Sequence, residues 1–140
     1  MIILDTNILS AVMQDRGDPI IVSWLDRQAW ESIWTTAITV FEIRLGLSSL
    51  TKGKRRIKLE EAFQQTLEKV LEGRILSFDE DAALAAGELA AGRRRRGVTV
   101  DMRDTQIAGI AIAKRSSIAT RNTKDFNGLS VSVINPWKES

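Results

Sequence analysis

The chain contains no histidine, no cysteine and no tyrosine among its 140 residues. Without histidine and cysteine it cannot build Ser-His-Asp or Cys-His nucleophile systems. Disulfides, zinc sites made of His or Cys, and haem ligation by these residues are excluded as well. Any hydrolytic chemistry must therefore use carboxylates, lysines, hydroxyl groups or a metal ion held by oxygen atoms. The absence of cysteine is compatible with the cytosol.

The chain also lacks a strong excess of charge and a long hydrophobic run. Lys and Arg number 20 and Asp and Glu 18, so the formal net charge of +2 does not by itself indicate a polyanionic partner. The longest apolar stretch, Ile107 to Ala113, includes a glycine and is far too short to span a bilayer. Because no basic or long apolar segment accompanies the N-terminus, we expect no signal peptide and a cytoplasmic protein.

Short apolar runs alternate along the chain with segments of helical character. The predicted strands cover residues 2–4, 32–35, 75–78, 117–120 and 131–134. The predicted helices cover residues 6–13, 18–28, 39–50, 53–72 and 79–96, and a last one runs from 101 or 103 to 115. Asp18, which is followed by a proline, and Asp79 are the predicted N-caps of their helices. This alternation favours an α/β fold with a mainly parallel sheet, and without repeats or linkers we expect one domain over residues 1–140. In such sheets, ligands bind outside the carboxyl ends of the strands.

Two carboxylates follow predicted strands. Asp5 comes directly after the strand 2–4, and Asp125 lies in the loop after the strand 117–120. Aspartate is common in turns and helix caps, so each of them taken alone has an ordinary structural explanation.

Asp104 is harder to explain structurally. On a helix it shares the apolar face with Ile107, Ala108 and Ala111, so we expect it to point inward. A buried carboxylate needs hydrogen bonds, a cation or a raised pKa. The structural alternative is stabilisation by the N-terminus of its own helix, but that role would more naturally place the charge outward.

Glu42 has a strong structural alternative. Thr39-x-x-Glu42 matches a capping box, in which Glu42 would accept a hydrogen bond from the backbone N–H of Thr39. Glu42 also shares a helix face with Leu45 and Gly46, which we expect to point inward. A glycine inside a helix costs about 1 kcal/mol relative to alanine. Close packing of Gly46 against another backbone would explain that cost.

Taken together, the acidic residues predict one site. Helix N-termini follow strand carboxyl ends in an α/β fold, so Asp5, Glu42, Asp104 and Asp125 are expected to converge on one edge of the sheet. Clustered carboxylates repel and need a cation or shared protons. Oxygen ligands alone suit Mg²⁺ or Mn²⁺. Such an ion generates hydroxide from water and binds phosphate oxygens, which replaces the missing histidine base.

Five segments of the chain form an ordered series of motifs: Leu4-Asp5-Thr6-Asn7, Ile38 to Gly46, Asp104-Thr105-Gln106-Ile107-Ala108, Ala119 to Phe126 and the ending Val133-Ile134-Asn135-Pro136. Through these segments the chain resembles the PIN-domain ribonucleases over nearly its whole length. Each segment alone is weakly specific, but together they occur in the right order. The subgroup that the chain is most similar to is the VapC-type toxins of toxin–antitoxin pairs, including the FitB-like members.

The resemblance implies a PIN-like three-layer α/β/α sandwich with a mainly parallel central sheet. It also implies a Mg²⁺-dependent endoribonuclease, a homodimer, and neutralisation by a small DNA-binding antitoxin. Asp5, Glu42 and Asp104 match the family's acidic positions, which implies catalytic and metal-ligating roles. Many relatives have an acid directly after the Thr-Arg pair, where this chain has Asn122. Either Asp125 or Asn122 therefore completes the catalytic site.

Two basic segments are candidates for contacts with RNA. Residues 52–58 carry five positive charges, and a second run consists of Arg93, Arg94, Arg95 and Arg96. The structural alternative is a solvated helix face or a favourable charge at a helix C-terminus. The functional interpretation is phosphate binding by Arg93–Arg96, together with Arg121 beside the predicted site. We assign no tryptophan or phenylalanine to RNA, because these residues more often belong to a core or an interface.

Other functions match parts of the same sequence pattern. Haloacid-dehalogenase-like phosphatases need Asp-x-Asp after the first strand, where this chain has Asn7, and receiver domains need an acidic pair that Asp5 lacks. A non-catalytic binding module that acts as a co-repressor with a DNA-binding antitoxin is the main alternative. DNA cleavage is a third possibility, since the metal chemistry does not distinguish the sugars. The Ala-rich segment 82–91 permits either core packing or a dimer contact.

Overall fold

The computed structural model describes residues 1–138. A parallel sheet with the strand order β3-β2-β1-β4-β5 forms its centre. The strands are β1 (Ile2–Leu4), β2 (Ile33–Thr36), β3 (Ile75–Leu76), β4 (Ser117–Ala119) and β5 (Val133–Ile134). The predicted parallel sheet is thus confirmed, although most strands are shorter than the apolar runs that indicated them.

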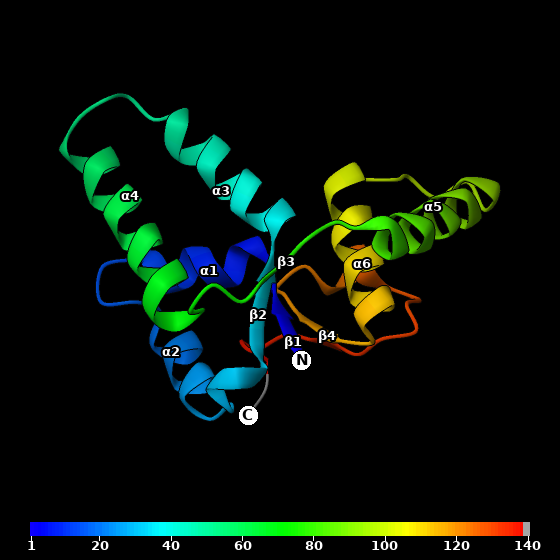
Figure 1. The fold of residues 1–140 in the computed structure, drawn as a ribbon, viewed down its shortest axis with the longest axis horizontal. Helices are drawn as coiled ribbons and strands as arrows, with labels where there is room; N and C mark the ends of the chain where they lie inside the picture. The colour runs from blue at the N-terminus through cyan, green and yellow to red at the C-terminus, as the bar shows by residue number, and fades with distance from the viewer. Residues whose placement is uncertain (139–140) are drawn as a thin grey trace.

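Helices cover both faces of this sheet (Figure 1). On one side lie α1 (Thr6–Met13), α2 (Pro19–Asp26), α3 (Ala37–Ser48) and α4 (Lys54–Gln65), and on the other α5 (Glu80–Arg95) and α6 (Met102–Lys114). The π-helical segment Thr66–Val70 continues α4, and short 3-10 helices cover Trp30–Ser32 and Thr123–Phe126. Within residues 1–138, none of these helices has the length and apolarity needed to cross a membrane.

The strand β1 contributes to the core on both sides of the sheet. Successive side chains of a strand point to opposite faces. Accordingly, Ile3 packs in the cluster that includes α6, whereas Leu4 packs in the cluster formed with α1, α2 and α3. Both are fully buried. The predicted three-layer α/β/α sandwich is therefore confirmed.

The register of the strands brings three polar residues to one edge of the sheet. Leu4 pairs with Ala119 of β4, and the next backbone N–H, that of Asp5, donates to the carbonyl of Ala119 at 3.0 Å. Thr36 ends the neighbouring strand β2, and Thr120 directly follows β4. Asp5, Thr36 and Thr120 are all buried. Parallel strands thus deliver these residues to a common carboxyl edge.

The predicted caps Asp18 and Asp79 are confirmed, and Asp101 is the residue that caps α6. Asp18, Asp79 and Asp101 each accept a hydrogen bond from a backbone N–H two or three residues further along. The start of α3 differs from the prediction. The backbone N–H of Thr39 donates to the hydroxyl of Thr36 at 3.1 Å, and not to the carboxylate of Glu42. The helix therefore begins at Ala37, and the predicted capping box of Thr39 and Glu42 is wrong.

The glycines in the helices also differ from expectation. A Cβ built on Gly46 meets nothing within 4 Å, and Leu45 beside it is 44% exposed. The prediction that both point inward is therefore wrong. Close approach occurs instead at Gly109 in α6, where a Cβ would lie 2.6 Å from the carbonyl oxygen of Ala82 and 2.7 Å from the Cβ of Ala86 in α5. Two alanines of the Ala-rich segment thus serve core packing.

Candidate active site

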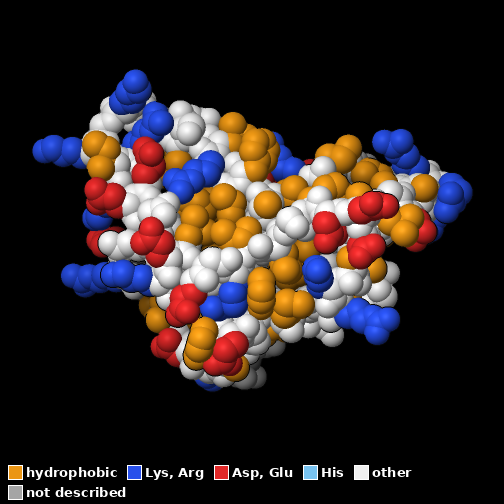
Figure 2. All heavy atoms as spheres, in the orientation of Figure 1, with side chains coloured by type: hydrophobic (Ala, Val, Ile, Leu, Met, Phe, Trp, Pro, Cys, Tyr) orange, Lys and Arg blue, Asp and Glu red, His pale blue; other side chains and the backbone are white. Residues whose placement is uncertain are grey.

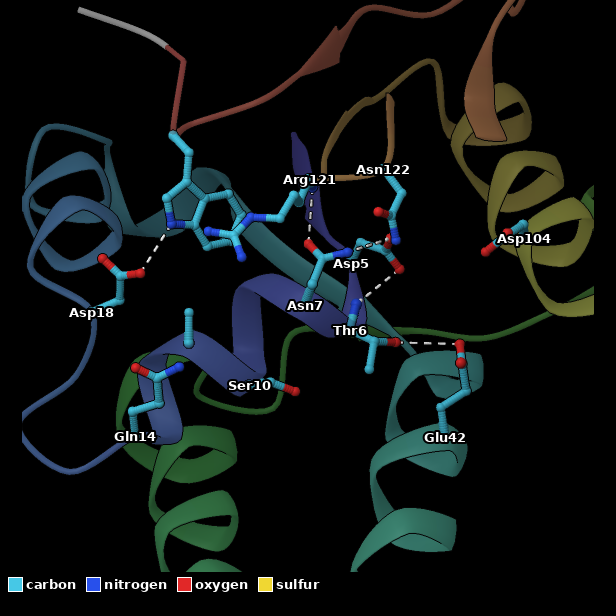
Figure 3. Close-up of a pocket in the computed structure, with 12 residues that line it drawn as sticks. Asp5, Thr6, Asn7, Ser10, Gln14, Asp18, Glu42, Asp104, Arg121 and Asn122 are labelled. Carbon is cyan, nitrogen blue, oxygen red and sulfur yellow. Dashed lines mark hydrogen bonds between the residues drawn. The ribbon is translucent and has the colours of Figure 1, made fainter. Parts of the chain in front are cut away.

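A cavity of about 470 Å³ opens beside the carboxyl edge of the sheet. It extends from the acidic residues along one face of α1 towards the start of α2 (Figure 3). The residues that line it are Asp5, Thr6, Asn7, Ser10, Ala11, Gln14, Asp18, Glu42, Asp104, Arg121, Asn122 and Trp137. Three of the four predicted carboxylates, from β1–α1, α3 and α6, therefore share one cavity.

Asp5 is held in place by three hydrogen-bond donors. Its Oδ1 accepts from the backbone N–H of Thr6 at 2.8 Å, and its Oδ2 accepts from the hydroxyl of Thr120 at 2.8 Å and the amide of Asn7 at 3.4 Å. Burial nevertheless raises the pKa of Asp5, because its loss of hydration outweighs these favourable hydrogen bonds. The carboxylate of Asp5 is thus fixed in orientation, but its donors are all neutral groups and do not balance its negative charge.

Glu42 is drawn towards Asp5 by the next residue along the chain. The Thr6 hydroxyl donates to Oε1 of Glu42 at 3.2 Å, while Oε2 lies 3.5 Å from Nη1 of Arg103. Burial raises the pKa of Glu42, with a further contribution from the negative charge of Asp5. Since Glu42 is not a capping residue, its position is explained by the cavity and by these two partners.

Asp104 has a strongly raised pKa. Burial, followed in decreasing order by the negative charges of Asp101, Asp5, Asp125 and Glu42, raises its pKa from 3.8 to about 7. Within residues 1–138, no hydrogen-bond donor contacts its carboxylate. The side chain faces the same space as Asp5 and Glu42 (Figure 3). The inward orientation predicted from the helix periodicity is confirmed.

The fourth position is divided between two residues. Asn122 lines the cavity of Asp5, whereas Asp125 lines a neighbouring cavity of about 580 Å³ that shares Asp104 with the first. The negative charge of Asp125 still raises the pKa of both Asp5 and Asp104. The four predicted carboxylates therefore interact electrostatically, but Asp125 approaches from the other side of Asp104.

The donor set fits a hydrated divalent cation. Within residues 1–138, no three carboxylates stand close enough together to ligate one ion at the same time. Mg²⁺ does not require such a cage, because it usually retains several waters and takes only one or two carboxylates. The raised pKa values of Asp5, Glu42 and Asp104 show negative charge that lacks compensation. A cation bound among their oxygens would relieve this repulsion.

The predicted run of four RNA-binding arginines is split by the structure. Arg93 is only 7% exposed, and its Nη2 donates to the backbone carbonyl of Asp125 at 3.3 Å. Arg93 therefore holds the segment that carries Asp125 and does not present its charge to solvent. Arg94, Arg95 and Arg96 are exposed at the end of α5, and Arg96 borders the cavity shared by Asp104 and Asp125.

A pair of cavity residues far from the acids was missed by the sequence analysis. Trp137 donates from Nε1 to Oδ2 of Asp18 at 2.9 Å, and the guanidinium carbon of Arg121 lies 3.7 Å from the centre of the Trp137 ring. No tryptophan was assigned to the site, and Asp18 was predicted only as a helix cap. The capping pattern at Asp18-Pro19 was the single sequence signal near this part of the cavity.

Comparisons with known proteins give a consistent assignment. The PIN domain family matches residues 2–130. Plasmid stability protein StbB of Pseudomonas syringae pv. tomato is 38% identical over 99% of each chain. VapC ribonuclease Y4jK of Sinorhizobium fredii is 36% identical over 99% of each chain. Toxin FitB of Neisseria gonorrhoeae is 35% identical over 99% of this chain and 100% of its own.

Solved structures agree with these relatives. The crystal structure of FitAcB from Neisseria gonorrhoeae superposes with a TM-score of 0.88 at 35% identity, covering 99% of this chain and 100% of that one. The structure of FitAB bound to an IR36 DNA fragment gives a TM-score of 0.88 at 35% identity, covering 100% of this chain and 98% of that one.

Proposed function

Since this chain belongs to the PIN domain family, we propose that it is a metal-dependent endoribonuclease and the toxin of a VapC-type toxin–antitoxin pair. It hydrolyses phosphodiester bonds of RNA in the cytoplasm. The observation that carries this proposal is the convergence of Asp5, Glu42 and Asp104 in one cavity, each with a raised pKa. Two relatives named VapC ribonuclease Y4jK and Toxin FitB support the proposed substrate and biological role.

In this proposal Asp5, Glu42 and Asp104 would hold a hydrated Mg²⁺, or Mn²⁺ in its place, with one or two carboxylates in direct contact and the rest bound through its waters. A bound ion of this kind activates water for attack and compensates the charge of the phosphate. Asp5 gives the site its fixed point, because three donors orient its carboxylate. The Thr6 hydroxyl aligns Glu42. Asn122 orients water or phosphate inside the cavity, and Asp125 adds negative charge beside Asp104.

The antitoxin is proposed to occupy an apolar groove beside these acids. This groove, of about 370 Å³, lies between α1, α3 and α4, and its apolar lining includes Met13, Ile43, Leu47 and Leu59. Figure 2 shows hydrophobic side chains gathered on the surface between α3 and α4. The groove shares Thr6, Ser10, Gln14 and Glu42 with the acidic cavity. A protein segment lying in it would therefore also obstruct the path of RNA to the site.

A homodimer that binds DNA through its antitoxin completes the proposal. The solved structure of FitAB is bound to a DNA fragment, which supports a DNA-binding partner for this chain. Exposed apolar side chains on and near the α5–α6 layer, among them Leu84, Val98 and Met102, offer a surface for the second copy. A purely non-catalytic co-repressor would need no acidic cavity, so the convergence of carboxylates favours the enzyme.

The decisive experiment uses the purified chain without antitoxin. We expect cleavage of single-stranded RNA in Mg²⁺ or Mn²⁺, complete loss of cleavage in excess EDTA, and recovery when Mg²⁺ is added back. The matched control is Asp104→Asn, which preserves shape but removes a charge and should cleave at no more than a small fraction of the wild-type rate. Undiminished cleavage in EDTA would refute metal dependence. Cleavage of DNA but not of RNA would show that the substrate is DNA and would contradict the proposed ribonuclease activity.

A further inference from the structure

The acidic cavity has a second part that the proposed chemistry does not use. Beyond Asn7 it continues along α1 past Ser10 and Gln14 to Asp18, with Arg121 and Trp137 opposite (Figure 3). We call this part the α1 arm. Its volume together with the acidic part, about 470 Å³, lies within the range of sites for small organic molecules, roughly 300–1,000 Å³.

A planar cation lies in the α1 arm. The guanidinium of Arg121 lies over the face of Trp137, 3.7 Å from the ring centre to the guanidinium carbon. Trp137 is itself anchored, because its Nε1 donates to Asp18 at 2.9 Å, and this hydrogen bond lowers the pKa of Asp18. The backbone N–H of Arg121 donates to Oδ1 of Asn7 at 3.0 Å. One face of the guanidinium is thus covered by the indole, while Arg121 as a residue stays exposed.

Side chains that can form hydrogen bonds with the edge of a nucleobase lie along the same arm. Ser10 in α1 and Gln14, which directly follows that helix, both line the cavity, and both are exposed. Within residues 1–138, no hydrogen-bond partner satisfies either side chain. A glutamine amide is a donor and an acceptor at once, which is what the edge of a nucleobase requires.

We propose that the α1 arm binds the unpaired base of the nucleotide that flanks the cleaved phosphate, stacked on Arg121 and contacted along its edge by Gln14 and Ser10. Single-stranded RNA is commonly recognised by stacking on aromatic rings or arginine planes and by hydrogen bonds to base edges. A phosphate fits this arm less well, because it would lie near the carboxylate of Asp18. The inference rests on the proposed ribonuclease function and adds which residues of the chain select the RNA sequence that is cleaved.

The test measures coupling between Arg121 and a single base. A short labelled single-stranded RNA is prepared as a series in which one base at a time is replaced by an abasic ribose. Binding is measured by fluorescence anisotropy in Mg²⁺ with Asp104→Asn protein, so that cleavage does not interfere. We expect one abasic position to weaken binding roughly 10-fold, as for a lost base stack, and this loss to shrink to about 2-fold or less in Asp104→Asn/Arg121→Lys.

Arg121→Lys keeps the charge and removes the plane, and Arg27→Lys at the end of α2, outside the cavity, is its matched control. The Arg27→Lys protein should keep the roughly 10-fold loss at the same abasic position. Gln14→Ala, an exposed change, should affect discrimination at that nucleotide and leave the thermal midpoint unchanged. A uniform loss in Arg121→Lys, independent of which base is missing, would mean a charge contact and would overturn the inference.

The two proposals fail differently in this design. A protein that shows the coupling but never cleaves RNA with Asp104 intact would refute the ribonuclease and support the base site. A protein that cleaves RNA but shows no coupling at any position would support the ribonuclease and overturn the base site.

Discussion

Asp104 is the least compensated carboxylate of the cavity. Asp5 has three hydrogen-bond donors and Glu42 has the Thr6 hydroxyl and Arg103, whereas within residues 1–138 no donor contacts the carboxylate of Asp104. Its pKa of about 7 follows from burial first and then from its acidic neighbours. The metal-free protein therefore holds repulsion at this residue that unfolding would relieve.

This repulsion predicts how the stability of the metal-free protein depends on pH. The pKa of Asp104 is raised on folding from 3.8 to about 7, so the folded state binds its proton more tightly than the unfolded state. The contribution of Asp104 to stability is thus fully present below the lower value and is lost as pH rises through the higher one. In EDTA, the thermal midpoint should fall between pH 5 and pH 8 more steeply for the wild type than for Asp104→Asn. Parallel pH profiles would contradict this assignment.

Glu42→Gln separates a charge role from a hydrogen-bonding role. Glutamine can still accept from the Thr6 hydroxyl but lacks the negative charge. If Glu42 belongs to the metal site, RNA cleavage should fall at least about tenfold, as is usual for groups that support a metal. The metal-free thermal midpoint should hold or rise, because one repelling charge is removed.

The control for Glu42→Gln is Thr36→Ala, because Thr36 is the residue that caps α3. Loss of the cap should cost about 1 kcal/mol in the free energy of unfolding and leave the chemistry largely intact. Cleavage rate and thermal midpoint are measured for both variants with and without Mg²⁺. A fully active Glu42→Gln protein would remove Glu42 from the site.

At the scale of elements, a local sequence pattern was enough to predict a helix cap or a buried helix face when all of its residues lie in one segment. Asp18 and Asp79 are caps that can be read from a few residues, and the inward face of α6 follows from its periodicity. The cap of α3 was not readable in this way. Thr36 and Thr39 are both able to cap a helix, and the choice depends on how far β2 extends along its neighbours.

Packing between elements was the harder part to predict. Gly46 and Gly109 are both helix-interior glycines, but only Gly109 faces another helix at close range. Which glycine lies at a contact depends on which helices meet, and that is decided by the whole topology. The difference has a consequence for function, because an unfilled position in α3 leaves room in the apolar groove.

Gly46→Leu should therefore stabilise the chain and block its partner. Nothing lies within 4 Å of a Cβ at Gly46, so the larger side chain removes the helix cost of glycine, up to about 1 kcal/mol, and projects into the groove. We expect a higher thermal midpoint and weaker antitoxin binding by calorimetry. Gly87→Leu in α5 is the matched control, since Gly87 is equally open but lies outside the groove. Unchanged antitoxin affinity in Gly46→Leu would place the partner elsewhere.

At the scale of the whole molecule, the site combines residues that are far apart in the chain. Asp5, Glu42 and Asp104 could be proposed from strand ends and helix faces because a parallel sheet gathers such positions at one edge. Trp137 could not, because its partner Asp18 lies 119 positions earlier and no local pattern connects them. The α1 arm thus depends on residues from the two ends of the chain that meet only in the folded protein. The acidic site follows from the alternation of strands and helices along the chain.

The distribution of positive charge also belongs to the whole molecule. Figure 2 shows Lys and Arg side chains projecting at opposite ends of the molecule, near the start of α4 and the end of α5. Of these two ends, the end of α5 borders a cavity that contains Asp104, through Arg93 and Arg96. Arg93 is buried on the Asp125 carbonyl. Under the proposed function, the exposed arginines 94–96 are therefore the candidates for contacts with RNA phosphates near the site.

Replacing Arg94, Arg95 and Arg96 together by glutamine should flatten the salt dependence of RNA binding. For single strands each neutralised phosphate contributes about −0.7 to the slope of log affinity against log salt, so three contacts predict a change of roughly 2. Lys52→Gln/Lys54→Gln/Arg55→Gln at the start of α4 removes the same charge at the other end. Anisotropy titrations over a range of salt concentrations should show a reduced slope only for the arginine variant. If both variants change the slope equally, binding follows net charge alone, and if neither does, the arginines at the end of α5 serve only to stabilise their helix C-terminus.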